Sequence, residues 1–210
     1  MVRHPLRRTF LLAGAALPAL PAGPANLLDP SLSQWESIGD GVWTIMRDGT
    51  LLGQRRPKES KHQAWLYTKR DFGQYDLHLE WWTVLGGNSG VSILDTSRAR
   101  WAVPPAWNAE KTPSHIGHEI QISNGYRDEK YPSGSIYLFA PARPGAQIDN
   151  DWNAFDISVR DSEIRVKLNG VEVASHPAVP GRPKRGPVGL QLHDARSVAK
   201  FRNIRIEEIR

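Results

Sequence analysis

From residue 30 onward, the sequence alternates apolar and polar residues in short runs and has no helical pattern of useful length. Successive side chains of a strand point to opposite faces, so a period of two indicates a strand with one buried face. Residues 152–176, WNAFDISVRDSEIRVKLNGVEVASH, contain three such runs in succession, with a tight turn at Asn169–Gly170. This pattern restricts the chain to a fold of short antiparallel strands.

Similar runs, separated by turn signals, recur along the whole chain. We expect a hairpin over residues 41–53 that turns at Asp48–Gly49, and two strands around a turn at residues 71–73. Further strands are expected within residues 88–95, 118–123, 133–140 and 186–209. The sequence therefore predicts an all-β fold, a sandwich of two antiparallel sheets. No repeat or linker indicates a second domain, so we expect a single domain over residues 27–210.

The first 25 residues have the organisation of an export signal. They begin with basic residues, continue with an apolar run over residues 10–20 and end in small residues. The apolar run is too short to span a bilayer, which takes about 20 residues. The RRTFL run at residues 7–11 resembles a twin-arginine signal, and Gly23 and Ala25 fit a signal-peptidase site. We expect cleavage after Ala25 and a periplasmic or extracellular mature protein; a buried N-terminal helix is the alternative.

Charge and cysteine content exclude several classes of function. Residues 1–25 hold three of the 27 Lys and Arg residues and none of the 22 Asp and Glu residues, which leaves a net charge of +2 for the rest. That value argues against nucleic-acid binding, and the dense basic stretch at residues 181–187, GRPKRGP, has the composition of a loop. The absence of cysteine excludes disulfides, thiolate nucleophiles and cysteine-based zinc sites.

Two of the expected strands carry a polar face. In HEIQIS, residues 118–123, Glu119, Gln121 and Ser123 alternate with two isoleucines. In VGLQLH, residues 188–193, Gln191 and His193 face away from three apolar residues. These faces are either solvated or line a sugar-binding site. The eight tryptophans fit both a sugar binder and an ordinary core, because flat rings stack on sugars and also fill cores.

Seven stretches occur in an order typical of one family. They are LYTKRDFGQYDLHLEW, GGNSGVSI, HEIQIS, SGSIYLFAP, DWNAFDI, KLNGVEV and GPVGLQLHDARSVAKFRNIRI. Over about residues 35–209, the chain resembles the 3-keto-disaccharide hydrolase domain family, formerly a domain of unknown function. The resemblance implies a jelly-roll sandwich of the concanavalin A-like lectin/glucanase type. Such folds host both enzymes and passive binders, so the site must decide the function.

The resemblance implies which residues form the site. Glu119 and His193 are the candidate catalytic groups. Candidate substrate contacts are Gln121, Glu80, Asn88, Tyr137 and Gln191, and Gly90 is expected to permit close sheet packing. Trp82 is added apart from the resemblance, as a ring that could stack on sugar. The family often has basic residues where this chain has Trp82 and Leu94. If those cations orient substrate in relatives, this chain either uses other cations, with Arg98 and Arg100 as candidates, or takes a different sugar.

The pattern of carboxylates bears on the mechanism. Retaining jelly-roll glucanases need two carboxylates on one face, whereas this strand offers only Glu119, unless Glu80 from another strand substitutes. A 3-keto sugar needs one base, because the C3 ketone acidifies the C2 proton and allows elimination of the group at C1. Water then adds to the enone, and the sum is hydrolysis. Glu119 is the candidate base, and His193 is a candidate acid, enolate donor or metal ligand.

Two other functions stay open. A non-catalytic carbohydrate-binding module would use Trp82 and the amide side chains, and a structural envelope protein would bind a protein segment. We expect a small glycoside as partner, with neither nucleic acid nor stable membrane insertion. No cofactor is required by the sequence; a divalent cation is an alternative, although no tight spacing of ligands is present. The sequence does not specify the sugar, the linkage or the oligomeric state. The loop over residues 98–115 is a candidate cap over the sugar-binding site.

Overall fold

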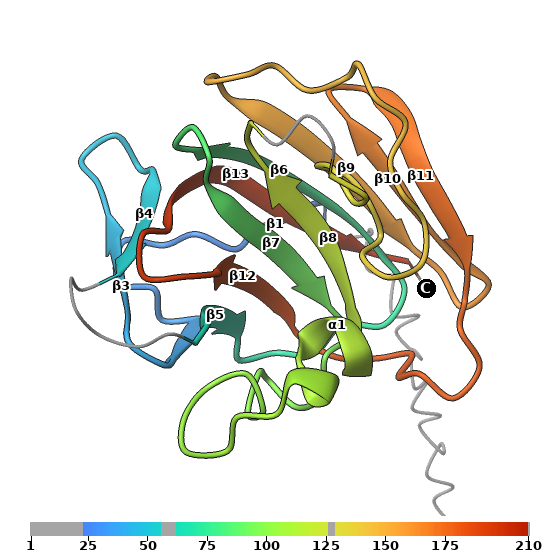
Figure 1. Cartoon of the computed structure of the whole chain (residues 1–210), viewed down its shortest axis with the longest axis horizontal. Helices are drawn as coiled ribbons and strands as arrows, with labels where there is room; N and C mark the ends of the chain where they lie inside the picture. The colour runs from blue at the N-terminus through green and yellow to red at the C-terminus, as the bar shows by residue number, and fades with distance from the viewer. Residues whose placement is uncertain (1–22, 56–61, 126–128, 210) are drawn as a thin grey trace, which may run out of the picture.

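The computed structural model describes residues 23–55, 62–125 and 129–209, and its strands form two antiparallel sheets packed face to face. The small sheet contains, in spatial order, β2 (Trp35–Ile38), β5 (Ala64–Thr68), β12 (Val188–Leu192), β7 (Asn88–Ile93) and β8 (His118–Ser123). The large sheet contains β11 (Val171–Pro177), β10 (Glu163–Leu168), β9 (Asn153–Val159), β6 (Tyr75–Thr83), β13 (Val198–Glu208), β4 (Leu51–Arg55) and β3 (Gly41–Ile45), with β1 (Ala25–Asn26) beside β13. Figure 1 shows β7, β8 and β12 in front of the large sheet.

The core lies between the two sheets and follows the alternation of the sequence. From β6, Leu77, Leu79 and Trp81 point inward and are at most 1% exposed. From β8 and β12, Ile120, Ile122 and Leu190 meet them from the small sheet. Burial of such side chains stabilises each by about 1.5–3 kcal/mol relative to exposure, which favours this register over a slip by one residue. The prediction of an all-β sandwich of two antiparallel sheets is confirmed.

Most of the expected strands lie where the alternation places them. The 41–53 hairpin forms with Asp48 and Gly49 in its turn, and Asn169–Gly170 joins β10 to β11 with both residues at positive φ. The strand expected over residues 133–140 is wrong as a regular strand. Only isolated bridges form there, because the chain turns back on itself between Ile136 and Ala140, with Leu138 at φ 72°.

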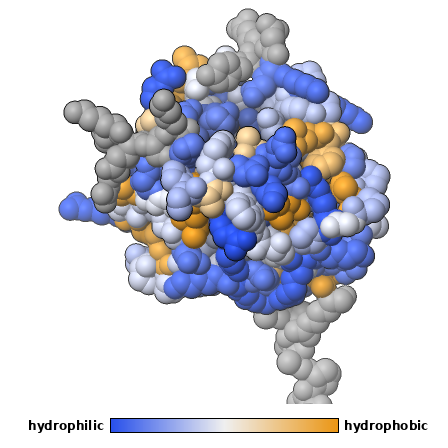
Figure 2. Space-filling view, turned by 60° about the horizontal axis from the view of Figure 1, so that its bottom comes forward, coloured by the Kyte–Doolittle hydropathy of each residue, from blue (hydrophilic) through white to orange (hydrophobic). Residues whose placement is uncertain are grey.

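The helical content of the described residues is small. A 3₁₀ turn (Ala109–Lys111) and the short helix α1 (Pro113–Ile116) precede β8. Figure 2 brings this end of the molecule toward the viewer and shows hydrophilic side chains around small apolar patches. No helix in the described part of the chain is long and apolar enough to cross a membrane.

The predicted export signal lies mostly outside the described residues, which begin at Gly23. Ala25 and Asn26 are described and pair with Ile206 and Arg205 as β1. Cleavage after Ala25 stays a prediction. It would remove one of the two residues of this strand.

Candidate functional site

The outer face of the small sheet carries the polar residues of β8. The strand pairing aligns four residues in one row across the sheet, in the order Tyr67, Gly189, Ser92 and Glu119. In the next row, Trp65 pairs with Gln191 and Gly90 pairs with Gln121. Alternation along each strand therefore gathers Glu119 and Gln191 onto one surface, while their apolar neighbours fill the core.

Two glycines make room for side chains that lie across this face. A Cβ at Gly90 would come within 2.5 Å of Glu119 Oε1, so the carboxyl lies directly over β7. A Cβ at Gly189 would come within 2.4 Å of Tyr67 Cε1, so the tyrosine ring lies over β12. Neither glycine has a positive φ, so space rather than backbone conformation requires glycine at both positions. Gly90 is expected from the sequence to permit close packing of the sheets; in the structure, its missing side chain instead makes room for Glu119 on the outer face.

The environment of Glu119 favours the protonated carboxyl. Its side chain is almost completely enclosed, with 5% of the residue exposed. Burial raises the pKa of Glu119 to about 8, and the negative charge of Asp95 adds to the increase. The Gln191 amide acts in the opposite direction, since it faces the carboxyl and favours the ionised form. A carboxyl with this pKa exchanges protons near neutral pH, as a general base or acid must.

Tyr67 and Asp95 close the face on the β5 side. The Tyr67 hydroxyl donates to Asp95 Oδ2 at 2.7 Å, and burial together with the Asp95 charge raises the pKa of Tyr67 far above its usual value. Asp95 also accepts from the Ala99 backbone N–H at 2.8 Å and from Ser97. Ala99 and Ala102 then pack on Trp65 and Tyr67. The loop after β7 therefore covers the β5 end of this face, within the candidate cap over residues 98–115.

Several buried polar atoms of this face and its border lack a partner of normal hydrogen-bond geometry. Within the described residues, both amide atoms of Gln191 are in this state, as are Ser92 Oγ and Glu129 Oε2. Gln191 and Ser92 are 0% exposed. An unpaired buried donor or acceptor costs about 1–3 kcal/mol, so such groups mark a place where water or a polar ligand binds.

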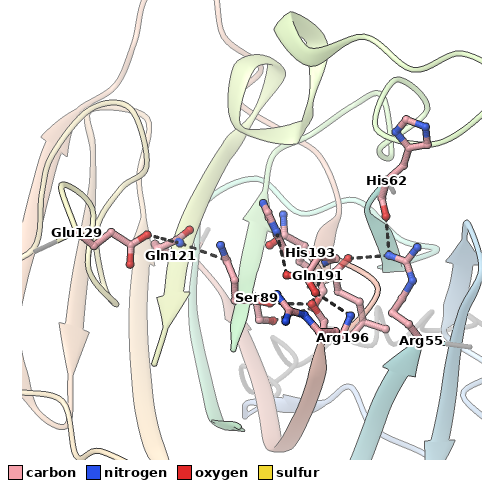
Figure 3. Close-up of polar contacts among 12 residues, drawn as sticks. Arg55, His62, Ser89, Gln121, Glu129, Gln191, His193 and Arg196 are labelled. Carbon is pink, nitrogen blue, oxygen red and sulfur yellow. Dashed lines mark hydrogen bonds and ion pairs between the residues drawn. The ribbon is translucent and has the colours of Figure 1, made fainter. Parts of the chain in front are cut away.

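Gln121, two residues after Glu119 on the same face of β8, binds a second carboxylate. Its Nε2 donates to Asn88 Oδ1 at 3.3 Å and to Glu129 Oε1 at 3.4 Å. Figure 3 shows Gln121 beside Glu129. Tyr137 borders the other side, where its backbone N–H donates to the Glu119 carbonyl at 2.8 Å. Burial raises the pKa of Tyr137, and Glu119 and Glu129 raise it further. The structure thus brings Gln121, Asn88 and Tyr137 together with Glu119.

His193 lies at the open end of the same face. It follows β12 two residues after Gln191, and its side chain is 44% exposed and 3.6 Å from Asp194. Arg55 donates from Nη1 to the Leu192 carbonyl at 3.2 Å, and Ser89 Oγ donates to the Gln191 carbonyl at 2.7 Å, which fixes this end of β12 (Figure 3). His193 shares the face with Glu119 but lies beyond the Gln191 row.

Glu80 and Trp82 lie on the opposite side of the sandwich, on the outer face of the large sheet. The Glu80 carboxylate accepts from Arg202 Nε at 2.6 Å and from the Asn203 amide. Trp82 lies beneath the Lys200 ammonium, 4.6 Å from the ring centre. Both belong to β6, whose inward face is core, so a period of two directs them away from the small sheet. The structure does not bring them together with Glu119, and Glu80 does not supply a second carboxylate there.

The two arginines considered as substitute cations are already engaged. Arg98 donates to the carbonyls of Thr68 and Lys69 and to the Asp71 carboxylate. Arg100 lies over the Trp101 ring, 4.5 Å from its centre.

Sequence reasoning missed Tyr67, Ser92, Asp95 and Glu129 as members of this site. Ser92 could have been found from alternation, since it shares a face of its strand with Gly90, whereas Tyr67 shares its face with Trp65 in a strand that is buried throughout. Glu129 and Asp95 follow strand ends and had no such signal.

Metal ligands and cavities give no further assignment at this face. No group of three or more His, Asp or Glu side chains in the described ranges is arranged to hold a metal ion. Three cavities lined by described residues lie elsewhere. One of about 540 Å³ is on the outer face of the large sheet, one of about 290 Å³ is beside Asn26, and one of about 230 Å³ is at the end of the sandwich near His118.

The sequence of residues 23–207 matches the model of the 3-keto-alpha-glucoside-1,2-lyase-like domain. The chain belongs to this family. The match spans both sheets and all the residues of the site described above, and it confirms the resemblance found from the seven stretches. None of the curated proteins matches the sequence at a significant level.

Solved structures share the fold at low sequence identity. A protein named "Putative glycosyl hydrolase" from Parabacteroides distasonis ATCC 8503 is 22% identical with a TM-score of 0.70, covering 90% of this chain and 100% of its own. A second protein of that name from the same organism is 18% identical with a TM-score of 0.69, covering 90% and 95%. The carbohydrate-binding module CBM66 from Bacillus subtilis is 13% identical with a TM-score of 0.53, covering 83% and 96%. These likenesses confirm the jelly-roll type of sandwich, and the functional argument rests on the site.

Proposed function

We propose that the chain cleaves 3-keto-glycosides by base-initiated elimination, with Glu119 as the base that removes the C2 proton. The observation that carries the proposal is the enclosed Glu119 carboxyl, which lies over Gly90 and faces the Gln191 amide. Membership of the 3-keto-alpha-glucoside-1,2-lyase-like family supports the proposed substrate class. The activity proposed is therefore that of a glycoside-processing enzyme.

The reaction proceeds in two balanced steps. Glu119 takes the proton from C2, the electron pair forms the C1–C2 double bond through the enolate, and the C1–O bond breaks to release the alcohol, which takes up a proton. Water then adds its hydroxyl to C1 and a proton to C2, which yields the free 3-keto sugar. A single positioned base contributes about 10²–10⁴-fold to the first step.

Neighbouring groups supply the remaining requirements of the proposal. Negative charge develops on the C3 oxygen as the proton leaves, and donors aimed at that oxygen lower the barrier. The Gln191 amide, which faces the Glu119 carboxyl, and the Ser92 hydroxyl are buried donors of the same face. Gln121 and Tyr137 flank Glu119 and are assigned to sugar hydroxyls. His193, at the open end, is assigned to the leaving group and to substrate binding.

The experiment uses a chromogenic 3-keto-α-glucoside and the matched unoxidised glucoside. The wild-type chain is expected to cleave only the keto substrate, because the C3 ketone is what makes the C2 proton acidic. Substrate deuterated at C2 should react more slowly, and product formed in D₂O should carry deuterium at C2. Glu119→Gln should abolish turnover while leaving the affinity measured by calorimetry largely intact.

Two results would reject the mechanism. Full turnover by Glu119→Gln would exclude Glu119 as the base. Binding of the keto sugar without product from the wild-type chain would favour the non-catalytic carbohydrate-binding module, the function of the CBM66 protein that shares this fold.

Export to the periplasm or cell exterior is part of this proposal. It is supported by the order of basic, apolar and small residues within residues 1–25 and by the RRTFL run. N-terminal sequencing of the mature chain after expression with the native leader checks it. Replacing both arginines of the run by lysine should block export, and unchanged export would exclude the twin-arginine route.

A further inference from the structure

The cavity of about 230 Å³ at the end of the sandwich lies apart from the Glu119 face. Residues at the start of β8, the turn between β9 and β10, and the segment 178–184 line it. Its volume exceeds that of one water molecule, which occupies about 30 Å³ in the liquid, and exposed Gly181 and Lys184 stand at its opening.

His118 is the buried polar group of this cavity. It is 2% exposed, and neither ring nitrogen has a hydrogen-bond partner among the described residues. Its ring contacts Phe139 at 5.4 Å between centroids. Burial, together with the nearby Arg182 and His176, lowers the pKa of His118 to about 4, so the ring is neutral and presents one N–H donor. A buried donor without an acceptor calls for a ligand or water.

The charges around His118 are mostly positive. Arg182 lies over the Phe139 ring at 4.6 Å and donates to the carbonyls of Ser114 and Gly117. Within the described chain it has no salt bridge to a carboxylate, and burial lowers its pKa. A partly buried cation without a counter-charge is costly, and an anion beside it offsets that cost.

The other charged groups of the lining are Arg160, Lys184 and Asp161. Arg160 is bonded through both nitrogens of its fork to Asp76 and to backbone carbonyls, so its charge is compensated. Lys184 is exposed, and Asp161 is the one carboxylate among the described lining residues. The lining therefore combines a neutral donor, an uncompensated guanidinium and a flexible ammonium, which together suit an oxyanion.

We propose that this cavity, which we call the His118 cavity, is a binding site for a small oxyanion. The neutral His118 N–H and the free edge of Arg182 hold the anion, and Lys184 closes over it. The shared chemistry is that of phosphate, sulfate or a sugar carboxylate. The site is separate from the proposed base, so Glu119→Gln should bind the anion as the wild type does.

The experiment titrates the full chain with sodium phosphate, sodium sulfate and sodium glucuronate at constant ionic strength set by sodium chloride. The readouts are the His118 imidazole signals by NMR and the midpoint of thermal unfolding. We expect a saturable shift of the His118 signals and a rise in the midpoint with at least one oxyanion. Tighter binding of glucuronate than of phosphate would identify a sugar acid as the source, and the reverse order would identify free phosphate.

Variants separate this site from general salt effects. Lys184→Ala should weaken binding about two- to fivefold, as expected for one exposed charge, whereas Arg185→Ala, which removes the adjacent exposed charge outside the cavity, should not change it. His118→Phe keeps the ring shape and should weaken binding about tenfold or more. Absence of saturable binding, or equal binding by wild type, Lys184→Ala and His118→Phe, would overturn the proposal.

Discussion

The Glu119 carboxyl occupies the space over Gly90 that any larger residue would fill. A Cβ at position 90 would lie 2.5 Å from Oε1 and 3.0 Å from Cγ of Glu119, well inside normal contact. Because residue 90 of β7 has no side chain, the Glu119 carboxyl can lie across β7 in this position. The relationship couples the geometry of β7 to the chemistry proposed for β8.

The first prediction follows from this contact. Gly90→Ala should displace the Glu119 carboxyl and lower kcat for a 3-keto-glucoside by about 10²-fold, because a shift of about 1 Å in a reacting group has an effect of this size. Gly73→Ala is the control, since a Cβ there meets nothing closer than 3.6 Å. Circular dichroism should show both variants folded, and an unchanged kcat in Gly90→Ala would mean that the carboxyl position is not critical.

The second prediction concerns the pH dependence of activity. With the pKa of Glu119 raised to about 8 by burial, most of the carboxyl is protonated at pH 7 and cannot act as a base. The value of kcat/KM should therefore rise about tenfold per pH unit below pH 8 and level off above it, since this parameter reports the free enzyme. Stopped assays from pH 5 to 9.5 check the profile. A plateau reached already at pH 5 would contradict the assignment.

A related variant shifts this profile in a known direction. The negative charge of Asp95 contributes to the raised pKa of Glu119. Asp95→Asn keeps acceptor capacity for the Tyr67 hydroxyl but removes the charge, so the rise in kcat/KM should move to lower pH. Retention of the wild-type profile in a folded Asp95→Asn variant would exclude the electrostatic link.

Alternation in the sequence was sufficient to predict most strands and the inward faces of β6, β8 and β12. The reason is that a period of two reports directly which side chains share a face. It does not report which side of the sandwich a polar face takes. Glu80 and Glu119 both alternate with apolar residues, yet the large sheet carries one and the small sheet carries the other.

Other features depended on contacts between distant segments. The order β5, β12, β7 and β8 brings Tyr67 and Gln191 beside Glu119, and no local pattern encodes it. The apolar alternation over residues 133–140 predicted a strand, but the chain turns at Leu138 and pairs Ile136 with both Ile120 and Ala140. Pairing with distant residues, rather than local strand propensity, therefore determines the conformation of residues 133–140.

The third prediction links the buried carboxyl to stability. The pKa of Glu119 is about 8 in the folded chain, against 4.5 as its model value. Between these values the folded state holds a proton that the unfolded state has released, so the free energy of unfolding falls as pH rises, by about 1.4 kcal/mol per pH unit at most. Glu119→Gln lacks this loss. The free energy of unfolding of Glu119→Gln, relative to that of the wild type, should therefore increase from pH 5 to pH 8 and then level off.

Urea unfolding at pH 5, 6, 7 and 8 measures this difference. Glu110→Gln, which removes an exposed carboxylate from the turn before α1, is the matched control and should show no such growth. A constant difference between Glu119→Gln and wild type across this range would show that the carboxyl is ionised in the folded chain throughout, contrary to the burial argument.

The fourth prediction tests the two faces of the sandwich against each other. Glu80→Gln and Trp82→Ala alter the outer face of the large sheet, where Glu80 pairs with Arg202 and Trp82 lies beneath Lys200. Both should leave kcat and KM for the keto substrate unchanged, because the sandwich core separates them from Glu119. Glu80→Gln should lower the free energy of unfolding by about 0.5–1 kcal/mol, as expected for a partly exposed ion pair. Tyr137→Phe, on the Glu119 face, is the contrast and should raise KM. Loss of turnover in Glu80→Gln with an unchanged fold would instead place the reaction on the large sheet.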